Sequence, residues 1–158
     1  MKLLFLALAF LGLIHPSSGK DVAVEDAFIV SLPDTAKKQT RSVQSTSIPD
    51  TILDKFGDAS FQLSIYRWPH VKADVSLNKI PEQWTQDKEW ASVSAISEGR
   101  TDSGIPYVTF RTRIVRDERR PFDSTMTVLR SPNGEAYMFQ MTGDKKAIDA
   151  IRKSIKNK

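Results

Sequence analysis

The 158-residue chain contains no cysteine and only two histidines, His15 and His70. The absence of cysteine excludes a thiol nucleophile, a thiolate metal site, a lipid-modified cysteine and any disulfide. His15 lies in a segment that we expect to be removed, and the one remaining histidine cannot supply a multi-histidine metal site. We therefore expect no metal and no cofactor.

Long apolar runs are also absent, except at the N-terminus. Lys2 precedes an unbroken apolar run over residues 3–14, and small residues follow up to Gly19. A basic end, a short apolar core and a small-residue exit are typical of a secretory signal peptide. The run is shorter than the about 20 residues that cross a bilayer. We predict a signal peptide over residues 1–19, cleaved after Gly19.

The segments after that cut set the expected domain organisation and location. We predict a loose, polar leader over residues 20–26 and a single domain over residues 27–158, a length that suits one hydrophobic core. Since no second long apolar run exists, the mature chain should have no transmembrane span. The signal peptide predicts a secreted or periplasmic location.

The charge balance is small and mildly basic. The formal net charge is +4, and loss of Lys2 with the signal peptide leaves +3. A charge of this size does not indicate nucleic acid as a partner, and a slightly basic solvated surface accounts for it.

Catalytic motifs are missing too. The sequence lacks the Gly-x-Ser-x-Gly, His-Glu-x-x-His and Gly-rich phosphate-loop patterns. His70 is best interpreted as a surface residue after a strand, although it could join a binding loop. Carboxylates are plentiful but none is singled out, so we predict no catalytic residue and no enzyme. A hydrolase with an unrecognised carboxylate pair remains the alternative, because such pairs meet only in the folded protein.

What the sequence does contain is strand periodicity and apolar spacing typical of three helices. Alternation or β-rich composition predicts strands over residues 27–32, 61–68, 91–98, 107–114, 122–130 and 136–141. Apolar spacing predicts helices over residues 49–57, 80–90 and 145–155, the last with Asp144 as its N-cap. Asn133 and Gly134 predict a hairpin turn with positive φ angles. The predicted class is α+β: an antiparallel sheet of about five to six strands flanked by helices, an α/β/α sandwich with the C-terminal helix packed on the sheet.

Three segments carry a resemblance to a known group. They are FIVSLP at 28–33, GIPYVTF at 104–110, and SPNGEAYMFQM at 131–141 with the helix that follows. In this order they resemble the PsbP-like group, which includes the PsbP protein of photosynthetic oxygen evolution and periplasmic proteins of the DcrB type. The last segment is similar to that group's hairpin with a Gly-x-x-Tyr turn, here Gly134 to Tyr137. The resemblance implies an α/β/α sandwich and an accessory or binding module without catalysis.

An arginine cluster is the most distinctive polar feature. Strand alternation places Arg111 and Arg113 together on one face, and Arg116, Arg119 and Arg120 follow in the next loop. Arginine binds carboxylate and phosphate groups through its planar fork. The cluster is either a binding surface for an acidic protein, a lipid headgroup or a cell-surface polymer, or a solvated strand face partly neutralised by neighbouring acids.

An aromatic pair is the second candidate for binding. Tyr66 and Trp68 share the strand face opposite Phe61, Leu63 and Ile65. If helices cover both faces of the sheet, the pair belongs to the core, and if one face is open, the pair and nearby His70 form a binding surface.

Together these observations predict an exported, non-enzymatic binding or accessory protein that recognises an anionic partner through the arginine-rich strand face. An inhibitor or immunity-type protein is a second interpretation within the binding class, and a secreted hydrolase is the rival class.

Cleavage after Gly19 can be tested directly. We expect the exported protein to begin at Lys20, because the small residues before that position suit a signal peptidase. Intact mass spectrometry of the exported protein measures this. A mass that retains residues 1–19 would instead indicate an uncleaved anchor.

Overall fold

A computed structural model describes residues 19–39, 51–69, 71, 73–86, 88–115 and 120–158. The predicted signal peptide, apart from Gly19, and the predicted site residues His70, Arg116 and Arg119 lie outside these residues. The described strands are β1 (Gly19–Val24), β2 (Phe28–Pro33), β3 (Lys37–Lys38), β4 (Thr51–Gly57), β5 (Phe61–Trp68), β6 (Ala91–Arg100), β7 (Pro106–Ile114), β8 (Phe122–Arg130), β9 (Ala136–Gly143) and β10 (Lys156–Asn157). The helices are the 3₁₀ turn η1 (Leu77–Lys79), α1 (Ile80–Thr85) and α2 (Lys145–Ser154).

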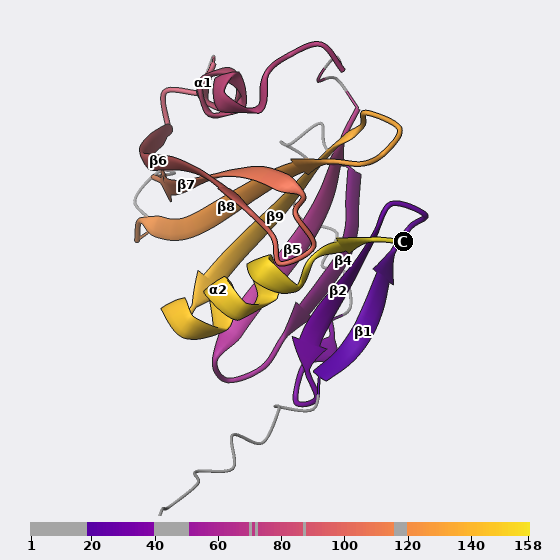
Figure 1. The fold of residues 1–158 in the computed structure, drawn as a ribbon. Helices are drawn as coiled ribbons and strands as arrows, with labels where there is room; N and C mark the ends of the chain where they lie inside the picture. Colours follow the sequence, from indigo (N-terminus) through magenta and orange to yellow (C-terminus); the bar gives the residue numbers. More distant parts are fainter. Residues whose placement is uncertain (1–18, 40–50, 70, 72, 87, 116–119) are drawn as a thin grey trace, which may run out of the picture.

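The strands form two sheets. The main sheet has seven strands in the order β3-β4-β5-β9-β8-β7-β6, and all of its neighbours are antiparallel. A smaller sheet has the order β1-β2-β10. In Figure 1, α1 lies on one side of the main sheet, whereas α2 and the smaller sheet lie on the other. The expected α+β class with a C-terminal helix on the sheet is confirmed, but the main sheet has seven strands rather than five to six.

The face toward α2 is one hydrophobic core. Phe61, Leu63 and Ile65 of β5 are each at most 2% exposed and meet apolar residues of β2 and α2. Phe28 of β2 packs edge-on against Tyr137 of β9, with ring centroids 5.3 Å apart. Burial of β2 against the main sheet explains why this segment is apolar at alternate positions.

The opposite face is a second core under α1. Trp84 of α1 is 1% exposed and packs at 6.3 Å from the ring of Phe110 on β7. Tyr66 and Trp68 are 6% and 8% exposed and belong to this cluster. Of the two alternatives for the aromatic pair, the core is therefore the one formed. Tyr66 and Trp68 do not make the exposed binding surface that was the other alternative, because α1 covers this face of the sheet.

Two local predictions are also wrong. Residues 51–57 form strand β4 and not a helix, and its register with β5 shifts between Ile52 and Asp54. The shift breaks the two-residue alternation, so the apolar residues fall at positions that also suit a helix. Residues 20–24 of the expected loose leader belong, with Gly19, to β1, which pairs with β2 along its length. β1 is an edge strand, and four of its six residues are exposed.

The remaining elements follow the sequence closely, with one shorter helix. β5 and β8 have the predicted limits, and the Ala147 amide donates to the Asp144 side chain at 3.0 Å to cap α2. The helix predicted over residues 80–90 ends at Thr85, because Gln86 is already extended with ψ 130°. In the β8–β9 turn, Gly134 has φ +82°, whereas Asn133 does not have a positive φ.

The start of α2 depends on a close backbone approach at Gly143. This glycine has φ +120°, and a Cβ here would lie 2.2 Å from the carbonyl oxygen of Ser60. The same approach allows the Asp144 amide to donate to that carbonyl at 2.8 Å. A glycine is therefore needed where the chain turns from β9 into α2.

The packing of α2 gives a stability prediction. Ile151→Asp should unfold the protein, because an unpaired carboxylate in this core costs several kcal/mol, against a total stability of about 5–15 kcal/mol. Lys146→Asp adds the same carboxylate on the exposed side of α2 and should change the melting temperature little. Equal melting temperatures for the two variants would show that α2 does not pack on the sheet.

The turn at Gly143 gives a second prediction. Gly143→Ala should lower the free energy of unfolding by about 2 kcal/mol or more, because both its φ angle and the Ser60 carbonyl oppose a side chain. Gly104→Ala, where φ is +86° but no atom lies within 4 Å, should cost about 1 kcal/mol or less. Urea denaturation measures both, and a larger loss at Gly104 would contradict the close approach.

Candidate functional site

The predicted site residues do not all meet. Arg111 and Arg113 are exposed on β7, and Arg120 is exposed just before β8. Tyr66 and Trp68 are buried in the core under α1. Of the predicted set, the described part of the chain therefore brings only the β7 arginines onto one open surface.

The position of these arginines follows from the alternation of β7. Val108 and Phe110 point into the core under α1, whereas Tyr107 packs in the core on the α2 side. Arg111 and Arg113 lie on the same side as Tyr107, farther along the strand, where they are exposed. One strand thus runs from the covered part of the sheet to an uncovered part.

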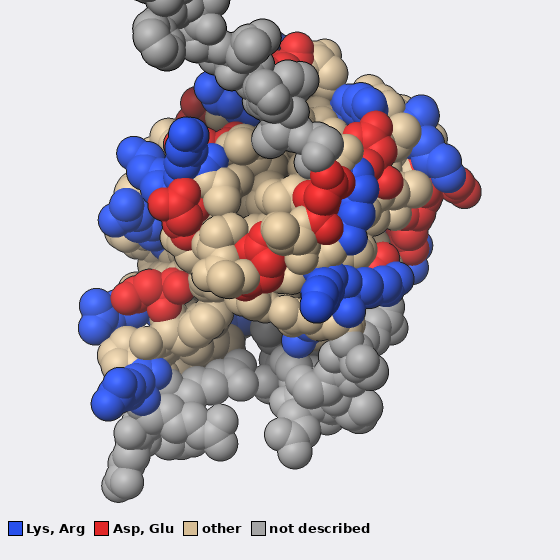
Figure 2. Space-filling view, turned by 90° about the horizontal axis from the view of Figure 1, so that it is seen from below, with Lys and Arg blue, Asp and Glu red and all other residues tan. Residues whose placement is uncertain are grey.

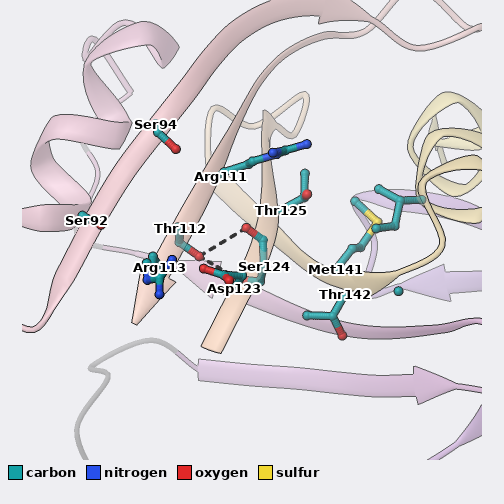
Figure 3. A pocket seen from close by; sticks show the side chains of 12 residues that line it. Ser92, Ser94, Arg111, Thr112, Arg113, Asp123, Ser124, Thr125, Met141 and Thr142 are labelled. Atoms are coloured by element: carbon teal, nitrogen blue, oxygen red, sulfur yellow. Dashed lines mark hydrogen bonds between the residues drawn. The ribbon is translucent and has the colours of Figure 1, made fainter. Parts of the chain in front are cut away.

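The uncovered part is hollowed. A cavity of about 410 Å³ is lined by Ser92 and Ser94 of β6, Arg111 and Arg113 of β7, Asp123 and Thr125 of β8, and Ile148 of α2, among others (Figure 3). A second cavity of about 430 Å³ shares Arg111, Thr125, Gly143 and Ile148 with the first and continues along α2 to Lys145 and Arg152. We call these two adjoining hollows the β7 groove.

The neighbours of the two arginines differ. In the strand register, Arg113 lies opposite Asp123 of β8 on one side and Ser92 of β6 on the other. Arg111 lies opposite Thr125 of β8 and Ser94 of β6. Neither arginine makes an ion pair or hydrogen bond with another described residue. Among the described residues, the groove thus offers two guanidinium groups whose donors have no partner, and in the strand register one of them, Arg111, lies beside hydroxyl groups.

A third arginine of the groove is already engaged. Arg152 donates to Asp149 at 2.5 Å and to the Thr109 hydroxyl at 3.4 Å, and its guanidinium lies 5.2 Å from the centre of the Tyr107 ring. Its side chain is only 14% exposed. Arg152 therefore fixes α2 against β7, while exposed Lys145 adds a further positive charge at the start of the helix.

Elsewhere the charges are mixed. The face seen from below in Figure 2 carries basic and acidic side chains next to one another. Ion pairs such as Lys156–Asp21 at 3.0 Å and Lys158–Asp26 at 2.8 Å join side chains of opposite sign. Arg111 and Arg113 of the β7 groove differ, because neither has such a partner among the residues that the structure describes.

A buried polar chain supports the strands behind the groove. The hydroxyls of Thr112 and Ser124 lie 2.7 Å apart, Gln140 donates to Ser124 at 3.0 Å, and Tyr66 donates to Gln140 at 2.9 Å. This chain links β7, β8, β9 and β5 on the face opposite Arg111. Because buried hydroxyl and amide groups need partners, it holds the four strands in one register.

Carboxylates gather in a different cavity, of about 290 Å³, lined by Glu25, Asp26, Glu135, Arg67 and Tyr137, among others. Glu25 accepts from the Tyr137 hydroxyl at 2.7 Å and lies 3.4 Å from Arg67. Burial, with the Glu25 carboxylate, raises the pKa of Tyr137 above its ordinary value. Glu25 thus has a structural role, which includes joining the β1–β2 turn to the main sheet.

No group of three or more potential metal ligands occurs among the residues that the structure describes.

The comparisons with known proteins bear on the fold. No family model and no curated protein matches the sequence. A solved structure does: the solution structure of cyanobacterial PsbP (CyanoP) from Synechocystis sp. PCC 6803, with 14% identity and a TM-score of 0.58, covering 96% of this chain and 99% of its own. The fold is PsbP-like. At this identity the likeness establishes the architecture, whereas function has to be argued from the site.

Within the PsbP-like fold, the sequence revealed some groove residues and missed others. Arg111 and Arg113 were found because alternation along one strand is visible in the sequence. Ser94 and Thr125 were missed, because they become neighbours of Arg111 only through the register of β6 and β8 with β7.

No helix in the described part of the chain is both long and apolar enough to span a bilayer.

Proposed function

We propose that this protein is an exported, non-catalytic accessory protein that binds an anionic partner through Arg111 and Arg113 in the β7 groove. The observation that carries the proposal is the pair of exposed arginines without an ion pair or hydrogen bond to another described residue. The accessory role is what the PsbP-like resemblance of the sequence implies, and the exported location rests on the N-terminal segment.

The surroundings of the pair favour an anion over a neutral ligand. Lys145 adds a charge of the same sign, and the hydroxyls of Ser94 and Thr125 add neutral donors beside Arg111. Of the acids that line the groove, Asp149 is already paired with Arg152, which leaves Asp123 beside Arg113. A carboxylate, sulfate or phosphate group near Arg111 would meet donors on three neighbouring strands.

The anchoring of the groove favours recognition without a large rearrangement. The floor includes Met141 and Ile148, at 0% and 7% exposed, so the strand and helix beneath it are packed in the core. The polar chain from Thr112 to Tyr66 fixes the far side of the same strands. A rigid site loses less conformational entropy when it binds its partner.

The test is a double variant. Arg111→Ser with Arg113→Ser should weaken binding to immobilised poly-L-glutamate or dextran sulfate by about tenfold at low salt, because each exposed charge pair contributes about 0.5–1 kcal/mol. Biolayer interferometry at low and high salt measures this. The difference between wild type and variant should shrink at high salt, where exposed charges are screened.

A matched control removes the same charge elsewhere. Lys146 and Lys153 are exposed on α2 and line none of the cavities described above. Lys146→Ser with Lys153→Ser should leave the affinity within about twofold, because the net charge falls equally but the groove is intact. If both double variants bind as wild type does, or lose affinity equally, the β7 groove is not the recognition site.

A further inference from the structure

The outer edge of β6 borders the β7 groove and has no described partner. β6 is the last strand of the main sheet and pairs only with β7. The Ala91 amide donates to the Lys88 carbonyl at 3.0 Å, but between Ser92 and Glu98 no backbone hydrogen bond is formed to any described segment other than β7. Edge strands with free N–H and C=O groups are templates for an additional strand.

Features that usually prevent an edge strand from pairing with a further strand occur in only one part of β6. The register with β7 shifts between Ser94 and Ser97, and Ala95 has φ +50°, which marks a bulge. The half from Ala91 to Ser94 precedes the bulge, pairs regularly with β7 and contains neither proline nor lysine. This half is therefore a regular edge, and Ile96 beyond it is 54% exposed.

The same half lies directly beside Arg111 and Arg113, which have no ion pair or hydrogen bond with another described residue. Ser92 pairs with Arg113, and Ser94 pairs with Arg111. Strands are spaced by about 4.8 Å, and paired side chains lie on the same face of the sheet. Because serine is short, both arginines can extend over β6 toward a strand added at its edge.

From this juxtaposition we propose that the occupant of the β7 groove is an extended acidic segment of a partner protein that pairs with the edge of β6 at Ser92–Ser94. The inference rests on the proposed function and specifies its partner. Alternate side chains of an extended chain are about 6.6–6.8 Å apart on one face, which is also the spacing of Arg111 and Arg113 along β7. An acid-x-acid pattern therefore matches the two guanidinium groups.

The two kinds of contact have different roles. Backbone hydrogen bonds to β6 supply affinity for any extended chain, and the arginines select acidic side chains. A lipid headgroup or a polysaccharide could meet the arginines, but neither has a peptide backbone to pair with the strand. The free edge therefore favours a polypeptide among anionic partners.

The probe is a seven-residue peptide in which three glutamates alternate with four threonines. Two derivatives carry N-methyl groups, one on every glutamate and the other on every threonine. Along an extended chain, alternate N–H groups point to opposite edges, so a peptide docked by one edge uses one set only. Binding to the full chain is measured by fluorescence anisotropy, and hydrogen exchange is followed at Ser92–Ser94.

We expect one N-methyl derivative to bind at least tenfold more weakly than the parent and the other to bind within about twofold of it. Hydrogen exchange within Ser92–Ser94 should slow when the parent peptide binds. An isomer with the three glutamates adjacent should bind at least threefold more weakly, because neighbouring side chains point to opposite faces.

The other outcomes separate this inference from the proposed function. No binding of the alternating peptide, or equal binding of both N-methyl derivatives without protection of β6, overturns edge pairing. If dextran sulfate binding still depends on Arg111 and Arg113, the proposed function stands with a non-peptide anion as the partner. If neither probe distinguishes the arginine variant from wild type, both proposals are wrong.

Discussion

The central strands β5, β9 and β8 bury side chains on both faces of the main sheet, and the other features of the structure depend on this two-sided burial. Phe139 on one face of β9 and Met138 on the other are each at most 1% exposed. A sheet of this kind needs a cover on each side. Here α1 covers one face, and α2 together with β1, β2 and β10 covers the other.

The second cover is too small for the whole sheet, and the β7 groove is the part that it leaves open. α2 has ten residues. It is held at its start by the turn at Gly143 and near its end by Arg152, which packs against Tyr107 of β7. Beyond it, β7 and β6 present arginine and serine instead of apolar residues. β7 thus contributes core residues to both faces of the sheet at its start. Farther along, Arg111 and Arg113 lie beyond the area that α2 covers and are available for recognition.

A PsbP-like likeness at 14% identity is consistent with this reasoning, since the fold depends on the spacing of buried residues more than on their identity. Polar groups at the open end are under no such packing constraint. Arg111, Ser94 and the free edge of β6 can therefore be features of this chain rather than of the fold, which is why the proposals are argued from the groove itself.

The sequence by itself determined the elements whose periodicity is unbroken: β5, β7, β8 and the capped helix α2, along with the shared face of Arg111 and Arg113. It did not determine β4, because a register shift at Leu53 disguised the alternation, or β1, because a polar edge strand resembles a loop. Only the tertiary structure decided that Tyr66 and Trp68 are core and that Arg111 has hydroxyl neighbours. Burial and cross-strand contacts depend on which element covers a face and on strand register, and both are set by contacts between residues far apart in the chain.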